Sequence, residues 1–364
     1  MNAADPPALL PGVSVILPIL NEDRHLEEAL TRILAQEYGG PLEVVLAVGP
    51  SSDATHQIAE RIAASDPRVV VVENPTGKTA SGLNVAVAAG RYDLLIRVDG
   101  HANLPDGYVA LVEQVLRETG AANVGGMMVP IGRTPFEQAV ARAMSSPLGI
   151  GSARIHTGGK PGPADTVYLG AFRRAALEGV GGFDERFVRA QDWELNLRLR
   201  RAGEVVWFDP RLAVTYRPRG TWSDLVRQFF RTGQWRRQVI RAYPGTAGLR
   251  YLAPPLTVIA VVGGALLAVF GAGVGPRSLV ASVIVPVAYV CIVLGGSVVV
   301  GRGLSWPARL RLPVVIGTMH LAWGAGFLRG LGRHGVPALV RRDYPGPART
   351  HHTGATTDRP TTED

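Results

Sequence analysis

The chain has 364 residues and a formal net charge of +8, with 38 lysine and arginine residues against 30 aspartate and glutamate residues. Its one cysteine excludes an intrachain disulfide and a cysteine-based zinc site. The basic balance fits nucleic acid, an anionic membrane or a phosphorylated substrate, and only the position of the charges can separate these partners. The first residues show no basic region ahead of an apolar stretch, so we expect no secretory signal there and a cytoplasmic location for the first two-thirds.

Strands and helices are predicted to alternate over the first hundred residues, after a proline- and alanine-rich start at residues 1–12 that we expect to be disordered. Four apolar runs are predicted strands, at residues 13–17, 42–48, 69–72 and 94–98. The segments between them have helical character, at residues 25–36, 53–64 and 79–89. This alternation predicts an α/β fold with a doubly wound, mostly parallel sheet.

Polar residues follow each predicted strand, and they are Asn21, Glu22, Asp53, Lys78, Asp99 and His101. Ligands of open α/β sheets bind outside the carboxyl ends of the strands, so these side chains are expected to line one crevice. Lys78 is suited to neutralise a phosphate, and Asp99 with His101 offers ligands for Mg²⁺ or Mn²⁺. The alternative at each position is a solvated loop residue, with an ordinary Asp-Gly turn at residues 99–100.

Residues 121–201 are less regular. A strand is predicted over 124–129, a flexible glycine-rich loop over 149–163 and a helix over 189–201. The segment contains no dinucleotide-binding, P-loop or nucleophile-elbow signature. Asp192, in the first turn of the predicted helix, is interpreted either as a favourable partner of the helix dipole or as a general base. The residues alone leave both interpretations open.

A helix is predicted over residues 221–243, with aromatic and apolar residues at helical spacing and several arginines beside them. Such a helix suits an anionic membrane surface, and the alternative is ordinary packing on the domain core. We therefore expect an amphipathic juxtamembrane helix at residues 221–250, after a catalytic domain at residues 13–220.

Two uncharged apolar stretches, at residues 256–274 and 278–300, are each long enough to cross a bilayer. Arginines flank the pair, so the positive-inside rule predicts a multi-pass protein of the cell membrane with both flanks in the cytoplasm. A third stretch at 312–328, within a membrane region of 254–328, is left open as a re-entrant, interfacial or weakly spanning segment. Residues 345–364 are expected to be disordered. A membrane accounts for the basic charge, so nucleic acid is not an expected partner.

Four motifs resemble those of the inverting family 2 glycosyltransferases, which have the GT-A fold. They are the opening strand Val13–Pro18 with Asn21 and Glu22, the metal motif at Asp99–His101, the base motif at Gln191–Glu194 and the segment Gln228–Arg236, which is similar to a Q-x-x-R-W motif. Histidine at position 101 and the sequence around Asp192 are most similar to the succinoglycan-biosynthesis glucosyltransferases. The resemblance covers residues 13–240.

This resemblance implies a nucleotide-diphosphate sugar donor, most often UDP-linked, and transfer of the sugar with inversion to a lipid-linked or glycan acceptor. It implies that Asp192 is the catalytic base and that Asp99 and His101 hold Mg²⁺ or Mn²⁺. The donor would be lined by Pro18, Asn21, Glu22, Asp53, Lys78 and Asp99. The acceptor and diphosphate would lie near Gln228, Trp235 and Arg236.

The leading hypothesis is therefore a membrane-anchored hexosyltransferase of polysaccharide biosynthesis. Within the same fold, a polyprenyl-phosphate sugar synthase is an alternative. A nucleotidyltransferase and a non-catalytic membrane scaffold are less favoured alternatives.

Overall fold

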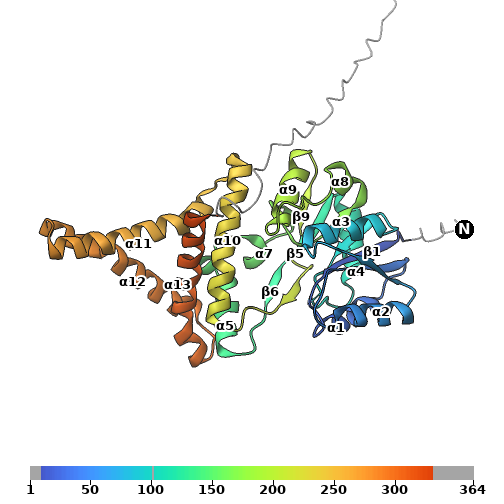
Figure 1. Cartoon of the computed structure of the whole chain (residues 1–364), viewed down its shortest axis with the longest axis horizontal. Coiled ribbons are helices and arrows are strands. Elements are labelled where there is room, and N and C mark those ends of the chain that lie inside the picture. Colours follow the sequence, from blue (N-terminus) through green and yellow to red (C-terminus); the bar gives the residue numbers. More distant parts are fainter. Residues whose placement is uncertain (1–9, 101, 331–364) are drawn as a thin grey trace, which may run out of the picture.

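The computed structural model describes residues 10–100 and 102–330. The expectations for His101, for residues 1–9 of the N-terminal segment and for the tail at 345–364 lie outside the described residues. Figure 1 shows an α/β body from which a group of long helices extends on one side.

The first half of the body is a parallel sheet in the order β3-β2-β1-β4. Its strands are β1 (Val13–Ile19), β2 (Leu42–Val48), β3 (Val69–Glu73) and β4 (Leu94–Arg97). The connecting helices are α1 (Leu26–Leu34), α2 (Thr55–Ser65) and α3 (Thr79–Ala89). Alternate residues of β1 enter two different apolar clusters, Val15 in one and Ile16 in the other. The strands are mainly apolar because both faces of the sheet are covered.

The second half completes a mixed sheet of eight strands in the order β3-β2-β1-β4-β8-β5-β9-β7. The added strands are β5 (Asn123–Gly126), β7 (Gly162–Pro163), β8 (Tyr168–Arg173) and β9 (Val206–Phe208). Strand β8 is antiparallel to its neighbours β4 and β5. A separate parallel pair consists of β6 (Met128–Pro130) and β10 (Val214–Tyr216). The helices of this half are α4 (Tyr108–Thr119), α5 (Pro135–Met144), α8 (Arg174–Gly179) and α9 (Gln191–Arg201).

Two local predictions differ from the structure. The strand predicted over 124–129 is split into β5 and β6, because Gly126 lies against the backbone of Leu212, where a β-carbon would come within 1.8 Å of the carbonyl oxygen. The loop predicted over 149–163 instead contains the short helices α6 (Pro147–Ile150) and α7 (Arg154–Thr157) and the strand β7. Capping by the Ser146 hydroxyl, which accepts from Leu148 N, begins the first of these helices.

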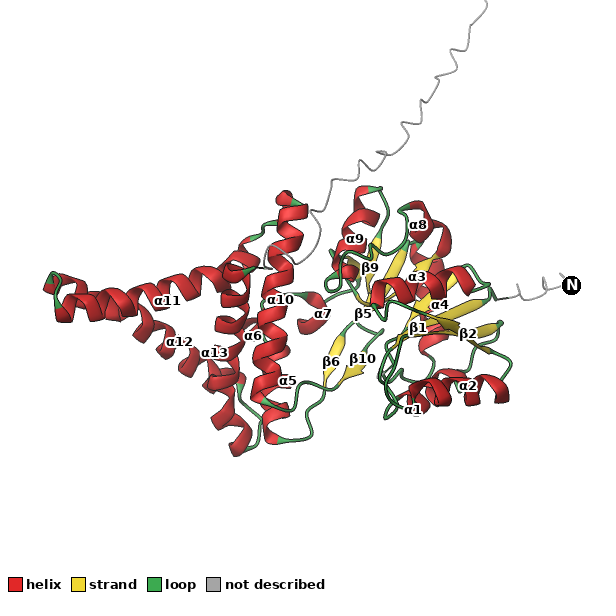
Figure 2. Cartoon of the chain, viewed as in Figure 1, coloured by secondary structure: helices red, strands yellow, loops and turns green. Residues whose placement is uncertain are grey.

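The helical side comprises α10 (Trp222–Ala242), α11 (Leu249–Gly273), α12 (Ile284–Val300) and α13 (Trp306–Arg329), with short 3-10 turns at Pro244–Thr246 and Arg277–Val283. Figures 1 and 2 show α11 and α12 projecting as a hairpin away from the body. Within the described residues, Leu249–Gly273 and Arg277–Val300 are the two helical segments long and apolar enough to cross a membrane, and only 17% and 11% of their apolar windows are buried.

Helix α10 lies between the body and α13. Leu225 and Phe229 are buried in a cluster with residues of α5 and α13, so protein rather than lipid covers this apolar face. The two helices approach closely because Gly233 faces the carbonyl of Trp323, and Gly326 faces the carbonyl of Phe230. The stretch 312–328, left open by the sequence, lies within α13 and supplies part of this buried cluster.

Candidate active site

A cavity of about 1480 Å³ opens at the carboxyl ends of β1 and β4. It extends to α9 and α10 and reaches α11 and α13. Of the side chains predicted for the site, Pro18, Glu22, Asp99, Asp192, Trp235 and Arg236 line this cavity. Residues more than 200 positions apart in the sequence therefore share one space.

Asn21, Asp53, Lys78 and Gln228 do not line the cavity, and hydrogen bonds of the first two support the loop beside it. Asn21 is in the left-handed backbone region at φ 54°, and its side-chain oxygen accepts from Ser52 N at 2.8 Å. Asp53 accepts from the backbone N–H of Thr55 at 3.0 Å and of Asp23 at 3.3 Å. Hydrogen bonding, first from Thr55, lowers the pKa of Asp53. These contacts hold the loop after β1 in place.

Lys78 and Gln228 also lie outside the cavity lining. Lys78 is the exposed residue immediately before α3, although its neighbours Gly77 and Thr79 do line the cavity. Gln228 Nε2 donates to the hydroxyl of Tyr216 at 3.4 Å. The structure therefore separates these two from the side chains at the centre.

Arg97, the last residue of β4, joins the two predicted carboxylates. Its Nη2 and Nε donate to Asp99 Oδ1 at 3.0 and 3.2 Å, and its Nη1 donates to Asp192 Oδ1. The Arg97 side chain is 5% exposed, whereas those of Asp99 and Asp192 are 24% and 39% exposed. The motifs did not predict a role for Arg97, although an arginine that ends an apolar strand two residues before Asp99 is a signal, because arginine is almost never buried unless it is paired.

Burial and neighbouring charges together shift the pKa values of Asp192 and Arg97. Although part of the Asp192 side chain faces the cavity, surrounding protein withdraws its carboxyl from bulk water and raises its pKa. The positive charge of Arg97 opposes this rise, and the negative charge of Asp99 adds to it. Burial alone would lower the pKa of Arg97, but the charges of Asp192 and Asp99 outweigh it, so this pKa is raised. Arg97 therefore remains a cation between the two carboxylates.

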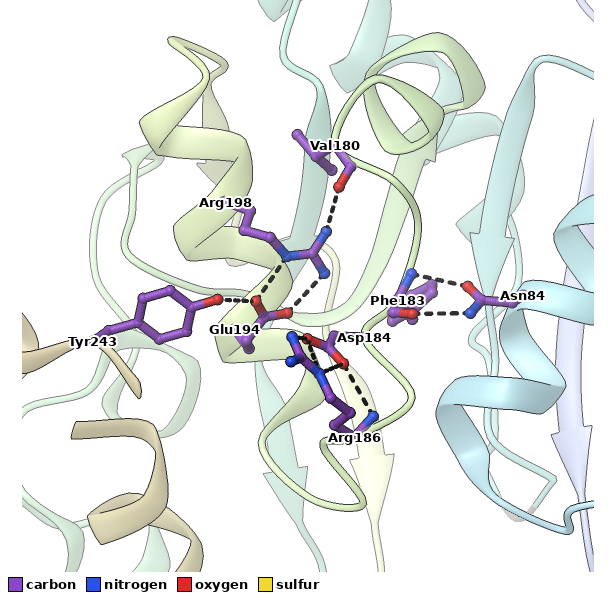
Figure 3. A network of polar contacts seen from close by, with 8 residues as sticks. All are labelled: Asn84, Val180, Phe183, Asp184, Arg186, Glu194, Arg198 and Tyr243. Atoms are coloured by element: carbon purple, nitrogen blue, oxygen red, sulfur yellow. Dashed lines mark hydrogen bonds and ion pairs between the residues drawn. The ribbon is translucent and has the colours of Figure 1, made fainter. Parts of the chain in front are cut away.

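A buried network fixes the helix that carries Asp192 (Figure 3). Glu194, which is fully buried, accepts two hydrogen bonds of 2.7 Å from Arg198 and one of 2.6 Å from the hydroxyl of Tyr243. Arg198 also donates to the carbonyl of Val180 at 2.7 Å. Glu194 therefore anchors α9 to the end of α10, which leaves Asp192 as the acidic residue of this turn that lines the cavity.

Positive charge and unpaired polar atoms line part of the cavity. The guanidinium of Arg236 lies 4.7 Å from the ring centre of Trp193 and 3.9 Å from that of Tyr251. Burial lowers the pKa of Arg236, and the charge of Arg250 lowers it further, despite an opposing effect of Tyr251. Four cavity-lining residues have a buried nitrogen without a hydrogen-bond partner among the described residues, and they are His156, Trp193, Arg200 and Arg236. This lining is suited to an anionic ligand.

The donor set at the β4 end is suited to a metal ion that arrives with a phosphorylated substrate. Within residues 10–100 and 102–330, no group of three or more His, Cys, Asp or Glu side chains is placed to hold a metal by itself. Asp99 nevertheless presents a carboxylate in the cavity, and Glu22 lies beside Gly100. Because Mg²⁺ is commonly bound by one or two carboxylates together with substrate phosphates, these residues fit a divalent ion shared with a diphosphate.

Comparison with known proteins identifies the family. Residues 14–181 match the family model described as glycosyl transferase family 2. The chain is 35% identical over 322 residues to the succinoglycan biosynthesis protein ExoA of Rhizobium meliloti (strain 1021), covering 87% of this chain and 94% of that protein. The chain belongs to glycosyltransferase family 2. The glycosyltransferase assignment made from the sequence motifs is thereby confirmed.

A further relative and a solved structure of similar fold each match most of the length of this family 2 glycosyltransferase. A dolichyl N-acetyl-alpha-D-glucosaminyl phosphate 3-beta-D-2,3-diacetamido-2,3-dideoxy-beta-D-glucuronosyltransferase of Methanococcus voltae is 21% identical over 329 residues, covering 88% of this chain and 97% of that protein. The solved mannosyltransferase PcManGT from Pyrobaculum calidifontis, in complex with GDP-Man and Mn²⁺, superposes with a TM-score of 0.59 at 22% identity and covers 91% of this chain and 90% of that one. This likeness confirms a GT-A-like fold with a mostly parallel sheet.

Proposed function

We propose that this family 2 enzyme transfers a hexose from a nucleotide-diphosphate sugar, UDP-linked, to a lipid-linked or polysaccharide acceptor with inversion at the anomeric carbon. The observation that carries the proposal is the meeting of Asp99 and Asp192 on one buried arginine inside a single cavity. The relationship to a succinoglycan biosynthesis protein supports a role in polysaccharide biosynthesis.

The nucleotide-sugar donor occupies the β1 and β4 end of the cavity in this proposal. Pro18, Glu22 and Asp99 contact it, and Asn21 and Asp53 keep the adjacent loop in shape. Asp99, with His101 as a further ligand proposed from the sequence, holds Mg²⁺ or Mn²⁺. The bound metal supplies Lewis-acid stabilisation of the leaving nucleoside diphosphate.

Asp192 acts as the general base for the acceptor. Its carboxylate accepts the proton of the attacking hydroxyl, while the bond from the anomeric carbon to the diphosphate oxygen breaks on the opposite face. A carboxyl group with a raised pKa is a better proton acceptor than an ordinary aspartate, and the charge of Arg97 favours its ionised form. The arrangement therefore suits a hydroxyl acceptor.

The acceptor enters from the helical side of the cavity. Trp235 and Arg236 of α10 line this side together with residues of α11 and α13. The largely unburied apolar surfaces of α11 and of residues 277–300 support insertion into a membrane, with the body in the cytoplasm according to the arginine-rich flanks. The relative from Methanococcus voltae is named for action on a dolichyl-phosphate-linked sugar, which supports a lipid-linked acceptor here.

The test is a donor screen. Membranes containing the enzyme are incubated with Mn²⁺, a lipid extract and a panel of UDP- and GDP-sugars, and released nucleotide is measured. We expect release of UDP that depends on the lipid extract. Release of pyrophosphate would indicate a nucleotidyltransferase instead, and the absence of both turnover and binding for every donor would favour a non-catalytic scaffold.

A further inference from the structure

Arg97 has a place in the site that the motifs do not predict. It is a strand residue in parallel register with Ile16 of β1, so its backbone is fixed at the centre of the sheet. Its side chain is 5% exposed, and within residues 10–100 and 102–330 its side-chain hydrogen bonds go to Asp99 and Asp192. Because the guanidinium stays charged at any accessible pH, burying it has to be compensated by these carboxylates.

The fork of Arg97 contacts each carboxylate through one oxygen. Nε and Nη2 both donate to Oδ1 of Asp99, and Nη1 donates to Oδ1 of Asp192. The first contact spans two residues, and the second spans 95. The sheet thus fixes the orientation of Asp192, which stands on α9, relative to the loop that carries Asp99.

We propose that Arg97 is a positioning residue for the transfer reaction, which holds the base Asp192 at a set place relative to the donor end of the cavity. The inference rests on the proposed roles of Asp99 and Asp192. A metal ion bound by Asp99 would share that carboxylate with Arg97 and would leave Asp192 as the other partner of the guanidinium.

Substitution of Arg97 should lower kcat without lowering the affinity for Mn²⁺ with UDP. A general structural defect would lower both quantities together. In Arg97→Gln, the base loses its partner, and we expect kcat to fall by about 100-fold, the effect of small misplacements of catalytic groups. The same change removes a cation that competes for Asp99, so affinity for Mn²⁺ with UDP should be kept or increased. Arg97→Lys keeps the charge but cannot donate to both carboxylates in the fixed geometry of a fork, so its kcat should lie between those of wild type and Arg97→Gln.

Arg173 provides the matched control. It is an arginine of the neighbouring strand β8, paired in register with Leu94, and its side chain donates to the backbone carbonyls of Ala121 and Leu116 rather than to carboxylates. Arg173→Lys should lower the melting temperature, and any change in its kcat should be matched by a parallel change in its Mn²⁺ affinity.

The experiment measures kcat and donor KM on the full-length protein in membranes, and Mn²⁺ binding in the presence of UDP by the electron paramagnetic resonance of free Mn²⁺. A lower kcat with preserved Mn²⁺ affinity in Arg97→Lys and Arg97→Gln would support the inference. Unchanged kcat, or parallel loss of kcat and Mn²⁺ affinity as in a destabilised protein, would overturn it. If Arg97→Gln does not fold, Arg97→Lys alone decides. A wild-type enzyme without turnover on any donor would contradict the proposed function, whereas an active wild type with an equally active Arg97→Lys would contradict only the role of Arg97.

Discussion

Replacing Asp192 with asparagine tests the assignment of the base. Asparagine has the same shape and keeps a side-chain oxygen that can accept the hydrogen bond of Arg97, so the local structure should persist. It cannot take a proton from an acceptor hydroxyl. Since a positioned general base contributes about 10²- to 10⁴-fold, kcat should fall by that factor, which equals about 3–5 kcal/mol of activation free energy.

The assay is the initial rate of nucleotide release with acceptor at saturation, together with the donor KM. We expect the donor KM of Asp192→Asn to stay near the wild-type value, because Asp99 and the β1 end of the cavity are unchanged. Asp165→Asn is the control, since Asp165 is another carboxylate of the cavity lining, paired with Arg200 at 3.2 Å and with Arg250 at 3.6 Å. Its rate should stay close to that of wild type.

Retention of most of the activity in Asp192→Asn would refute the reasoning. It would instead favour the polyprenyl-phosphate alternative, because a phosphate acceptor is already an anion and needs no base.

Three further predictions concern pH and packing. The pKa of Asp192 is raised, so the loss of kcat on acidification should begin at a pH above the ordinary aspartate pKa of about 3.9. A pH–kcat profile whose acid limb lies at or below that value would contradict a buried Asp192. A β-carbon on Gly326 would lie 2.0 Å from a carbonyl oxygen of α10, so Gly326→Ala should cost about 1–3 kcal/mol and lower the melting temperature in detergent, whereas Gly295→Ala, with nothing within 4 Å, should not. Glu194→Ala removes the buried partner of Arg198 and should cost about 3–5 kcal/mol of stability; an unchanged melting temperature would show that this ion pair does not anchor α9.

The elements of the first half of the fold are predictable from the sequence because their strands are buried on both faces. Apolar runs such as residues 42–48 and 94–97 are explained by strands buried in a parallel sheet, and helices with short connections lie between them. The same regularity places Pro18, Glu22 and Asp99 at one end of the sheet. The two apolar helical segments near residues 249–300 follow from length and composition in the same way.

The centre of the site is less predictable because it depends on contacts distant in sequence. Nothing local to Asp99 indicates that Asp192, on α9, meets the same guanidinium. The sequence places Arg97 at the end of an apolar strand, but only the fold shows which carboxylates it pairs with. Likewise, the apolar face of α10 has the pattern of a membrane-surface helix, and only the position of α13 explains why protein covers it.

Metal-dependent nucleotide binding at Asp99 tests the central claim most directly. Calorimetric titration of UDP into the full-length protein, with and without Mn²⁺, is compared for wild type and Asp99→Asn. We predict that Mn²⁺ strengthens UDP binding to wild type and that this gain is lost in Asp99→Asn. A UDP affinity that is the same with and without Mn²⁺, or an undiminished gain in Asp99→Asn, would contradict a donor site built on this carboxylate.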